Sequence, residues 1–352
     1  MGKDEDDDVL KALERRFGSE SNGPDERAED GGGDGSEAPK VPSHRLFSPV
    51  QLAQCLKGLN DETKAVLTSM QSRGAIRKLT LVPDHFRELC GELAEEFPNF
   101  QGYINEYLLP FLALGHVRGG AWHVPPTVLV GPPGVGKTLF VSELASRFGL
   151  SFDRLNLETS QASFELVGTS RGWASSQPGR LLRWLGTACY APNGIFVLEE
   201  LDKAGGGDPR YAPMNALIQL FEPTTARSFG DQSVPELKLD VSPVNFVCTA
   251  NSLDGISDPV LSRLLVIHVP TLTPDQAKRV AMKQYERILR DLALPVEPPE
   301  LTDAGLEALS AESPRRQRLL LQLAIGRAIA ERARELHVQR QTLRQSRGIG
   351  FF

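Results

Sequence analysis

The sequence has little that would tie it to a membrane, a secretory route or a zinc ion. No apolar run reaches the ~18 residues that a membrane-spanning helix needs. The start has five acids at residues 4–8, lacks an apolar signal core and is too acidic for a transit peptide. The few cysteines form no CxxC pair; they are Cys55, Cys90, Cys189 and Cys248. These absences predict a reduced, cytoplasmic chain without a membrane span or a cysteine zinc site.

The charge of the chain is concentrated at its start. The net charge is −6, and residues 1–40 hold 13 acidic and 6 basic side chains (a net of −7), so the remainder carries +1. A near-neutral body argues against a broad nucleic-acid footprint. The glycines and acids of residues 1–42 cannot bury enough apolar surface to offset the entropy of ordering, which predicts a disordered acidic tail.

The rest of the chain shows three patterns. Residues 43–122 contain short stretches of helical periodicity, which predict a helical N-terminal region. Short runs that are apolar on both faces then alternate with helical stretches, as buried parallel strands do, and predict an α/β three-layer domain over 123–271. The runs are Thr127–Val130, Phe152–Leu157, Ile195–Leu198, Asn245–Thr249 and Leu265–Val269.

The chain is predicted to be helical from residue 272 to near its end. A capping box, Thr273-Pro-Asp-Gln276, opens a helix to about Asp291, and Ser313-Pro314 opens a second helix to about Leu336. These helices predict a small helical domain over 272–345, followed by a C-terminal tail, 346–352.

The clearest motif is a glycine-rich loop, Gly131-Pro-Pro-Gly134-Val-Gly136-Lys137-Thr138, between the first predicted strand and a helix. It matches G-x-x-x-x-G-K-[ST] in the strand–loop–helix context that this phosphate-binding motif requires. Its N–H groups and the helix N-terminus suit phosphates, Lys137 would bridge the β- and γ-phosphates, and the Thr138 hydroxyl would ligate Mg²⁺. The predicted nucleotide-binding residues here are Gly131, Pro132, Pro133, Gly134, Val135, Gly136, Lys137, Thr138 and Leu139. The alternative is a glycine turn without a ligand.

Polar residues also end two further predicted strands. Glu199 and Glu200 follow Ile195–Leu198; the first can hold the Mg²⁺ shell through water, and the second can orient or deprotonate an attacking water. Asn251 follows Asn245–Thr249, and in a parallel sheet it would lie beside the γ-phosphate, between the two other motifs. The alternatives are an acidic helix cap and an ordinary turn asparagine.

These motifs belong to a longer pattern, over residues 124–340, that resembles the AAA+ ATPases and most of all the ATPase module of Lon proteases. It includes Pro178-Gly-Arg180, Phe229-Gly-Asp231 and Pro259-Val-Leu-Ser-Arg263. The resemblance implies ATP and Mg²⁺ as ligands, a five-stranded parallel sheet with a helical lid, and a ring-shaped oligomer, a homo-hexamer, that remodels or threads a protein substrate.

The resemblance also implies roles for three residues outside those motifs. Arg263 matches the arginine finger, which acts on ATP in the neighbouring subunit. Arg315 matches the second sensor of the lid, where it would act on bound nucleotide, with Arg316 as a rival. Trp173 stands where Lon-like enzymes carry an aromatic pore-loop residue. For the arginines, the alternative is a surface position or an ion pair. For Trp173, the alternatives are a side chain packed in its own domain and a ring that stacks on a nucleobase.

The sequence departs from the Lon pattern in ways that bear on function. It has no room after the lid for the Lon peptidase domain, so proteolysis by this chain is not expected. Glu199 replaces the usual Asp, and its longer arm could slow hydrolysis, since an error of ~1 Å in position can lower a rate ~100-fold. The leading prediction is an ATP-hydrolysing protein remodeller; the alternatives are an ATP-gated scaffold with little hydrolysis and a nucleic-acid motor or loader.

Overall fold

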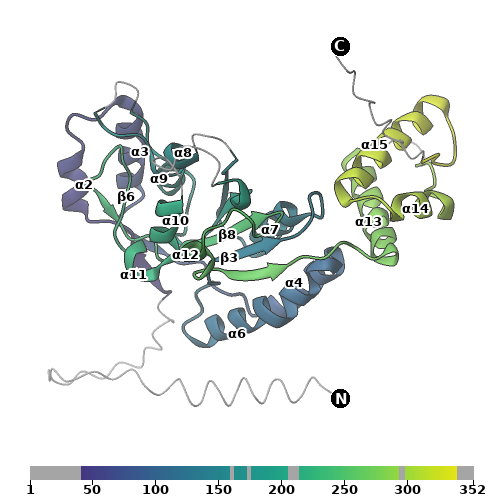
Figure 1. Cartoon of the computed structure of the whole chain (residues 1–352), viewed down its shortest axis with the longest axis horizontal. Coiled ribbons are helices and arrows are strands. Elements are labelled where there is room, and N and C mark those ends of the chain that lie inside the picture. The colour runs from purple at the N-terminus through teal and green to yellow at the C-terminus, as the bar shows by residue number, and fades with distance from the viewer. Residues whose placement is uncertain (1–40, 159–161, 173–175, 205–213, 293–297, 339–352) are drawn as a thin grey trace, which may run out of the picture.

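The fold is built on a five-stranded parallel sheet with the strand order β4-β5-β8-β3-β9; two neighbouring strands of it, β8 and β3, are labelled in Figure 1. We describe a computed structural model over residues 41–158, 162–172, 176–204, 214–292 and 298–338. The strands are β3 (Thr127–Val130), β4 (Phe152–Asn156), β5 (Ile195–Glu199), β8 (Asn245–Ala250) and β9 (Leu265–His268). All five predicted strands are confirmed, each to within one residue at its carboxyl end.

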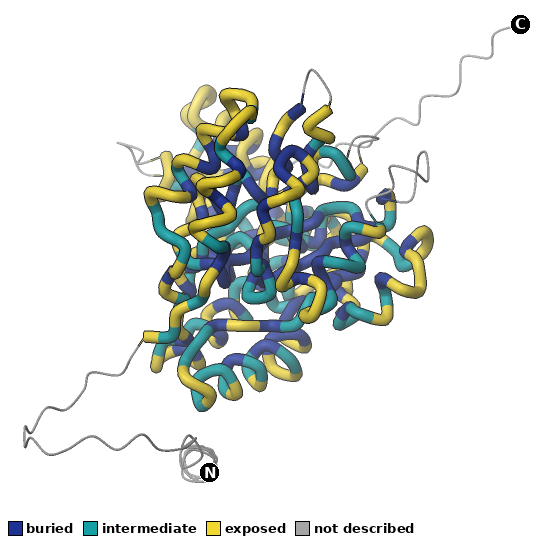
Figure 2. Tube along the Cα trace, turned by 90° about the vertical axis from the view of Figure 1, so that its left-hand side faces the viewer, coloured by how far each residue is buried: buried dark blue, intermediate teal, exposed yellow. Residues whose placement is uncertain are grey.

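Each face of the sheet is covered, which explains why the strands are apolar on both sides. Along β5, Phe196 and Leu198 enter one core, and Ile195 and Val197 enter the other. The first core contains side chains of α8 (Ala162–Val167), α9 (Arg180–Thr187) and α10 (Met214–Phe221). The second contains α7 (Lys137–Arg147), the helix that follows the glycine-rich loop. Figure 2 shows buried segments, in dark blue, running through the middle of the molecule.

Short elements complete the α/β domain. They are η3 (Leu201–Lys203), α11 (Pro223–Ala226), β6 (Phe229–Gly230), β7 (Lys238–Leu239) and α12 (Asp258–Leu261). Strands β6 and β7 form an antiparallel pair outside the main sheet.

The N-terminal region supplies helices to both cores. Helices α2 (Pro49–Cys55) and α3 (Asp61–Ser72) join the first core, and α4 (Phe86–Glu96) joins the second. A continuous run follows α4: η1 (Pro98–Phe100), α5 (Gln101–Tyr103), the π-helical turn η2 (Ile104–Leu108) and α6 (Leu109–Val117). The region is mainly helical, as predicted. It also contains two strands that were not predicted, because β1 (Ser43–Arg45) and β2 (Ile76–Lys78) form an antiparallel pair. Strands of three residues are too short for an alternating pattern to reveal them.

The C-terminal helices form a lid with a core of its own. They are α13 (Pro274–Leu292), α14 (Asp303–Ser310) and α15 (Pro314–Glu331). The predicted capping box is present: Thr273 N–H donates to Gln276 Oε1 (2.9 Å), and Gln276 N–H donates to Thr273 Oγ1 (3.3 Å). Helix α15 ends five residues before the predicted Leu336, because Arg332 adopts a left-handed backbone (φ 53°). Figure 1 places the lid at one end of the molecule and α2 and α3 at the other.

Ion pairs join the lid to the body of the protein. Arg287 of α13 contacts Glu96 of α4 (3.6 Å) and Glu143 of α7 (3.0 Å). Lys283 of α13 lies 3.8 Å from Glu95 of α4. The lid therefore meets the body through charged side chains of two helices that precede it in the chain.

Some predictions fall where the structure is not described. The acidic tail at 1–42 lies almost wholly outside the described residues, and the C-terminal tail at 346–352 lies wholly outside them. Within the described ranges no helix combines the length and the apolar character needed to cross a membrane. All four cysteines are buried and free. The domain boundaries stay predictions.

Helix α9 packs tightly against helix α3 at Gly186, where a Cβ atom would lie 2.7 Å from Val66 Cγ1. We expect Gly186→Ala to lower the free energy of unfolding by about 1–3 kcal/mol through overpacking. Gly91→Ala is the matched control, because nothing lies within 4 Å of a Cβ at that helical position. It should be neutral or stabilise by up to about 1 kcal/mol. Urea denaturation measures both, and equal stabilities would contradict the close contact.

Candidate nucleotide-binding site

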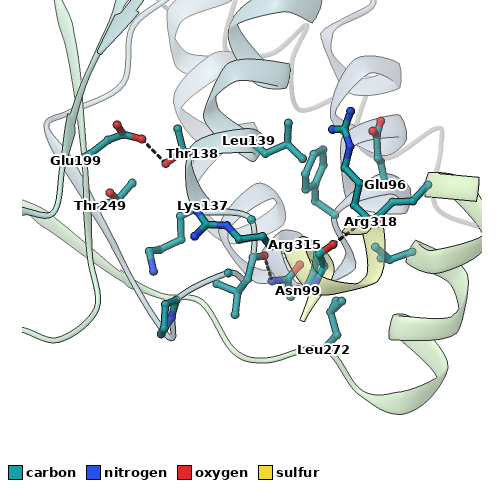
Figure 3. Close-up of a pocket in the computed structure, with 18 of the residues that line it drawn as sticks. Glu96, Asn99, Lys137, Thr138, Leu139, Glu199, Thr249, Leu272, Arg315 and Arg318 are labelled. Atoms are coloured by element: carbon teal, nitrogen blue, oxygen red, sulfur yellow. Dashed lines mark hydrogen bonds between the residues drawn. The ribbon is translucent and has the colours of Figure 1, made fainter. Parts of the chain in front are cut away.

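A cavity of about 580 Å³ lies at the carboxyl ends of the parallel strands. Its walls come from three parts of the chain: the α/β domain, the lid, and the turn that follows α4 (Figure 3). The sheet places the predicted motifs together because β8 lies between β3 and β5. The volume is in the range of small-molecule and cofactor sites, about 300–1,000 Å³.

The glycine-rich loop turns sharply before α7. Gly134 and Gly136 have φ values of +81° and +98°, which other residues rarely adopt. Gly131 is needed for a different reason, since a Cβ there would lie 2.3 Å from the Val269 carbonyl oxygen. The loop therefore exposes its backbone N–H groups at the start of a helix, an arrangement that suits an anion.

Lys137 is held inside this loop. Its ammonium group donates to the carbonyl oxygens of Gly131 (2.6 Å) and Pro132 (3.0 Å) and to Asn251 Oδ1 (3.2 Å). Burial lowers the pKa of Lys137, Arg315 lowers it further, and nearby carboxylates oppose the shift. A phosphate in the cavity would favour the charged ammonium and compensate for its burial.

Thr138 and Glu199 both line the cavity and lie next to each other, joined by a dashed line in Figure 3. The Thr138 hydroxyl donates to Glu199 Oε1 at 2.7 Å. Arg154 Nη1, from β4, lies 3.6 Å from the same oxygen. The longer arm of glutamate thus brings its carboxylate within direct reach of the hydroxyl that was predicted to ligate Mg²⁺.

Glu200 has a strained backbone. Its φ and ψ values are 59° and 47°, a left-handed conformation that is uncommon outside glycine and clusters at functional sites. Its N–H donates to Thr249 Oγ1 (3.4 Å), which fixes the turn after β5. Burial and then the carboxylate of Glu158 raise the pKa of Glu200. A carboxylate with a raised pKa is a stronger base once it is ionised.

The lid contributes two arginines to the cavity. Arg315 and Arg318 lie on α15 and line it, and Figure 3 shows Arg315 extending toward the glycine-rich loop. A Cβ at Gly134 would lie 3.8 Å from Arg315 Cβ. Arg316 points elsewhere and pairs with Glu312 (3.2 Å). The geometry separates the two rivals: Arg315 is at the cavity, and Arg316 is not among its lining residues.

Several predicted residues do not line this cavity. Gly131 and Pro132 offer their carbonyl groups to Lys137, while the rest of the loop through Leu139 lines the cavity. Arg263 donates to the Pro259 carbonyl (2.7 Å) and pairs with Glu222 (3.3 Å), away from the cavity of its own chain. Trp173 lies outside the described residues.

Sequence reasoning missed part of the lining. Arg318 follows Arg315 by one helical turn, and this spacing could have identified it. Asn99, in the turn after α4, is buried and donates to the carbonyls of Val135 (3.2 Å) and Pro270 (3.3 Å). It ties the glycine-rich loop to the segment before the lid, and no motif marks it.

These residues fit Mg²⁺ and a nucleoside triphosphate. The anchored ammonium of Lys137, the N–H groups of the loop and Arg315 match phosphate oxygens. Thr138 and Glu199 supply the hard oxygen donors that Mg²⁺ prefers when phosphates complete its shell. Among the described residues, no group of three or more His, Cys, Asp or Glu could hold a metal by itself.

Comparison with known proteins agrees with this geometry. Residues 127–271 match the family model "ATPase family associated with various cellular activities (AAA)". Lon protease 2 of Herpetosiphon aurantiacus is 33% identical over 180 residues, which is 51% of this chain and 22% of that protein. The Lon protease of Xanthomonas oryzae pv. oryzae is 37% identical over 180 residues, 51% of this chain and 21% of that protein.

A plant relative is similar over a longer stretch. The peroxisomal Lon protease homolog 2 of Zea mays is 32% identical over 201 residues, 56% of this chain and 22% of that protein. The match of residues 127–271 to the AAA model implies nucleotide binding, and in sequence these residues resemble the ATPase module of Lon proteases. The matched segment spans about a fifth of the length of these relatives.

The two neighbouring lid arginines allow a matched test. Arg315→Ala should weaken binding of a fluorescent ATP analogue about 10-fold or more, because a charged partner for phosphate is lost. Arg316→Ala should leave the Kd within about twofold, because Arg316 pairs with Glu312 outside the cavity. Titration by fluorescence anisotropy gives both constants. The reverse order of effects would assign the nucleotide contact to Arg316.

Proposed function

We propose that this chain hydrolyses ATP in a ring-shaped oligomer, a homo-hexamer, to remodel or thread a protein substrate. The observation that carries the proposal is the convergence of Lys137, Thr138, Glu199, Glu200 and Asn251 on one cavity that the lid closes with Arg315. The Lon names of the relatives support a polypeptide substrate for this chain. Its cytoplasmic location stays a prediction from the sequence.

Each residue has a chemical role in this proposal. Glu200 orients the attacking water and accepts its proton, and Asn251 holds that water while bonding to Lys137. Lys137 and Arg315 stabilise negative charge on the phosphates. Thr138, and Glu199 through water, would hold Mg²⁺, which when bound would neutralise charge on the phosphates.

Arg263 supports a site shared between subunits. It lies outside the cavity of its own chain, and its ion pair with Glu222 is partly exposed. Such a pair stabilises a protein by about 0–1 kcal/mol. Arg263 can therefore leave Glu222 and contact a phosphate of ATP bound to the neighbouring subunit at little cost in free energy. An arginine supplied in trans is worth about 10³–10⁵ in rate in other phosphoryl-transfer enzymes.

Glu199 does not favour the scaffold alternative. Its carboxylate reaches the Thr138 hydroxyl at 2.7 Å, so the extra methylene does not remove it from the site. The near-neutral body likewise gives no support to a nucleic-acid motor. We therefore advance the ATP-driven protein remodeller alone.

Complementation between subunits tests the shared site. Glu200→Gln and Arg263→Ala should each lower the steady-state ATPase rate about 100-fold or more. An equal mixture should recover activity, because an Arg263→Ala subunit with an intact Glu200 can receive Arg263 from a Glu200→Gln neighbour. Random assembly gives about a quarter of the parent rate, since about one interface in four has this order.

The control mixture pairs Glu200→Gln with Lys137→Ala, in which no single site is complete. It should stay inactive. Recovery in the control, or its absence from the test mixture, would contradict a site built from two subunits. Stimulation of the parent ATPase by unfolded casein tests the substrate class in the same assay.

The pH profile tests the influence of Glu158 on Glu200. As pH falls, a base with a raised pKa is protonated earlier, so activity is lost at a higher pH. Glu158→Gln removes one cause of that raised pKa. The acid limb of kcat/KM should then move to lower pH. Glu88→Gln, on α4 outside the cavity, is the control, and an unmoved limb in Glu158→Gln would show that Glu158 does not act on Glu200.

A further inference from the structure

The segment that joins β9 to α13, residues 269–273, begins alongside the glycine-rich loop, and we call it the lid linker. Val269 N–H donates to the Val130 carbonyl (2.7 Å), and a Cβ at Gly131 would lie 2.3 Å from the Val269 carbonyl oxygen. In the described part of the chain, no later residue of the lid linker makes a backbone hydrogen bond to the body of the protein. The direction in which the lid leaves the body therefore depends on side chains.

One buried side chain holds the lid linker at its second residue. Asn99, in the turn after α4, is 8% exposed and lines the cavity. Its Nδ2 donates to the Pro270 carbonyl (3.3 Å) and to the Val135 carbonyl in the glycine-rich loop (3.2 Å). Both partners can only accept, so the amide nitrogen has to face them. A single amide group thus joins the glycine-rich loop to the lid linker.

Aromatic packing holds Asn99 against α7. Phe97 and Phe100 flank it in the sequence, and both rings pack on Phe140, with centroid distances of 5.5 Å and 4.2 Å. All three rings are buried. Phe140 lies one turn after Lys137, the first residue of α7. The turn that carries Asn99 therefore packs against the same helix that presents Lys137 to the cavity.

The position of Arg315 depends on the lid linker through α13. Gln284 Nε2, on α13, donates to the Pro314 carbonyl (3.2 Å) at the start of α15. The glycine-rich loop lies close to the same point, since a Cβ at Gly134 would lie 3.1 Å from Ser313 Oγ and 3.8 Å from Arg315 Cβ. A shift of the lid linker would therefore move α13, the start of α15 and Arg315 relative to the loop.

The ion pairs between lid and body are more exposed than the Asn99 contact. Arg287 and Lys283 are roughly half exposed where they meet Glu96 and Glu95. Exposed pairs of this kind contribute little, because water screens them. The loss of a buried donor costs more, because its acceptors lose a partner where water does not replace it. Asn99 is therefore better placed than the ion pairs to fix the lid linker.

We propose that Asn99 is a positioning residue for Arg315. By anchoring the lid linker to the glycine-rich loop, it fixes the point about which the lid turns, and so the reach of Arg315 toward a bound phosphate. Within the described residues no hydrogen bond joins Asn99 to Arg315, both labelled in Figure 3, so the effect passes through the lid linker. This inference rests on nucleotide binding in the proposed function, and not on the ring or the polypeptide substrate.

A double-mutant cycle on the full chain tests this route. Arg315→Ala should weaken binding of a fluorescent ATP analogue about 10-fold. Asn99→Ala should weaken it about fivefold, because Arg315 is no longer held near the phosphates. The double variant should bind about 10-fold more weakly than the parent, whereas independent effects would multiply to about 50-fold. Fluorescence anisotropy gives the four Kd values.

Gly186→Ala is the matched control, because it overpacks α9 against α3 outside the cavity. In that background Arg315→Ala should keep its effect of about 10-fold. If Asn99→Ala does not fold, as judged by its urea midpoint, Asn99→Asp decides, since it keeps the shape of the side chain and at neutral pH loses the donor.

A second measurement needs no nucleotide. The Val269 amide is protected by its hydrogen bond to Val130 at the start of the lid linker. Its exchange, followed by mass spectrometry on a peptide that contains residues 269–273, should become about fivefold faster in Asn99→Ala, because the next residue has lost its anchor. Exchange in Gly186→Ala should match the parent.

The outcomes separate this inference from the proposed function. If the parent binds the analogue and the two effects multiply, or if Asn99→Ala leaves binding or Val269 exchange unchanged, the inference alone is overturned. If the parent does not bind the analogue, the proposed ATP hydrolysis fails and the inference fails with it. A double variant no weaker than Arg315→Ala, an intact control and faster Val269 exchange together support the inference.

Discussion

The candidate nucleotide site depends on the position of β8 between β3 and β5. Because the strands are parallel, their carboxyl ends meet at one edge, and the residues that follow them meet there too. This order brings Asn251 to 3.2 Å from the Lys137 ammonium. It also sets Glu199, at the end of β5, opposite Thr138 at the start of α7. Another strand order would separate these groups even if every strand formed.

Much of this edge could be predicted from sequence. The glycine-rich loop stood between a strand and a helix, and Glu199, Glu200 and Asn251 each followed an apolar run. Such signals are local in the sequence, so they can be recognised without knowledge of the fold. The side of the lid that faces the cavity could not be predicted, because Arg315 and Arg316 are adjacent and only the packing of α15 separates them.

The N-terminal region shows where sequence reasoning fails. Its helices do not make a core of their own; Leu52 and Val66 pack in one core of the sheet, and Phe86 and Ile104 pack in the other. Helical periodicity predicts that a helix buries one face, but it does not predict which partner covers that face. Asn99 has no sequence signal either, since its contacts are made to backbone carbonyls far along the chain.

The polar contact between lid and body has a mechanical consequence. The lid has its own apolar core, and Arg287 and Lys283 are roughly half exposed where they meet Glu96, Glu143 and Glu95. Exposed ion pairs of this kind contribute only about 0–1 kcal/mol each. Turning the lid as a rigid body would therefore separate charges that water can solvate, and would leave its apolar core intact. The ion pairs resist rotation of the lid only weakly. A ligand that contacts both the lid and the body can therefore set the angle between them with a few kcal/mol of its own binding energy.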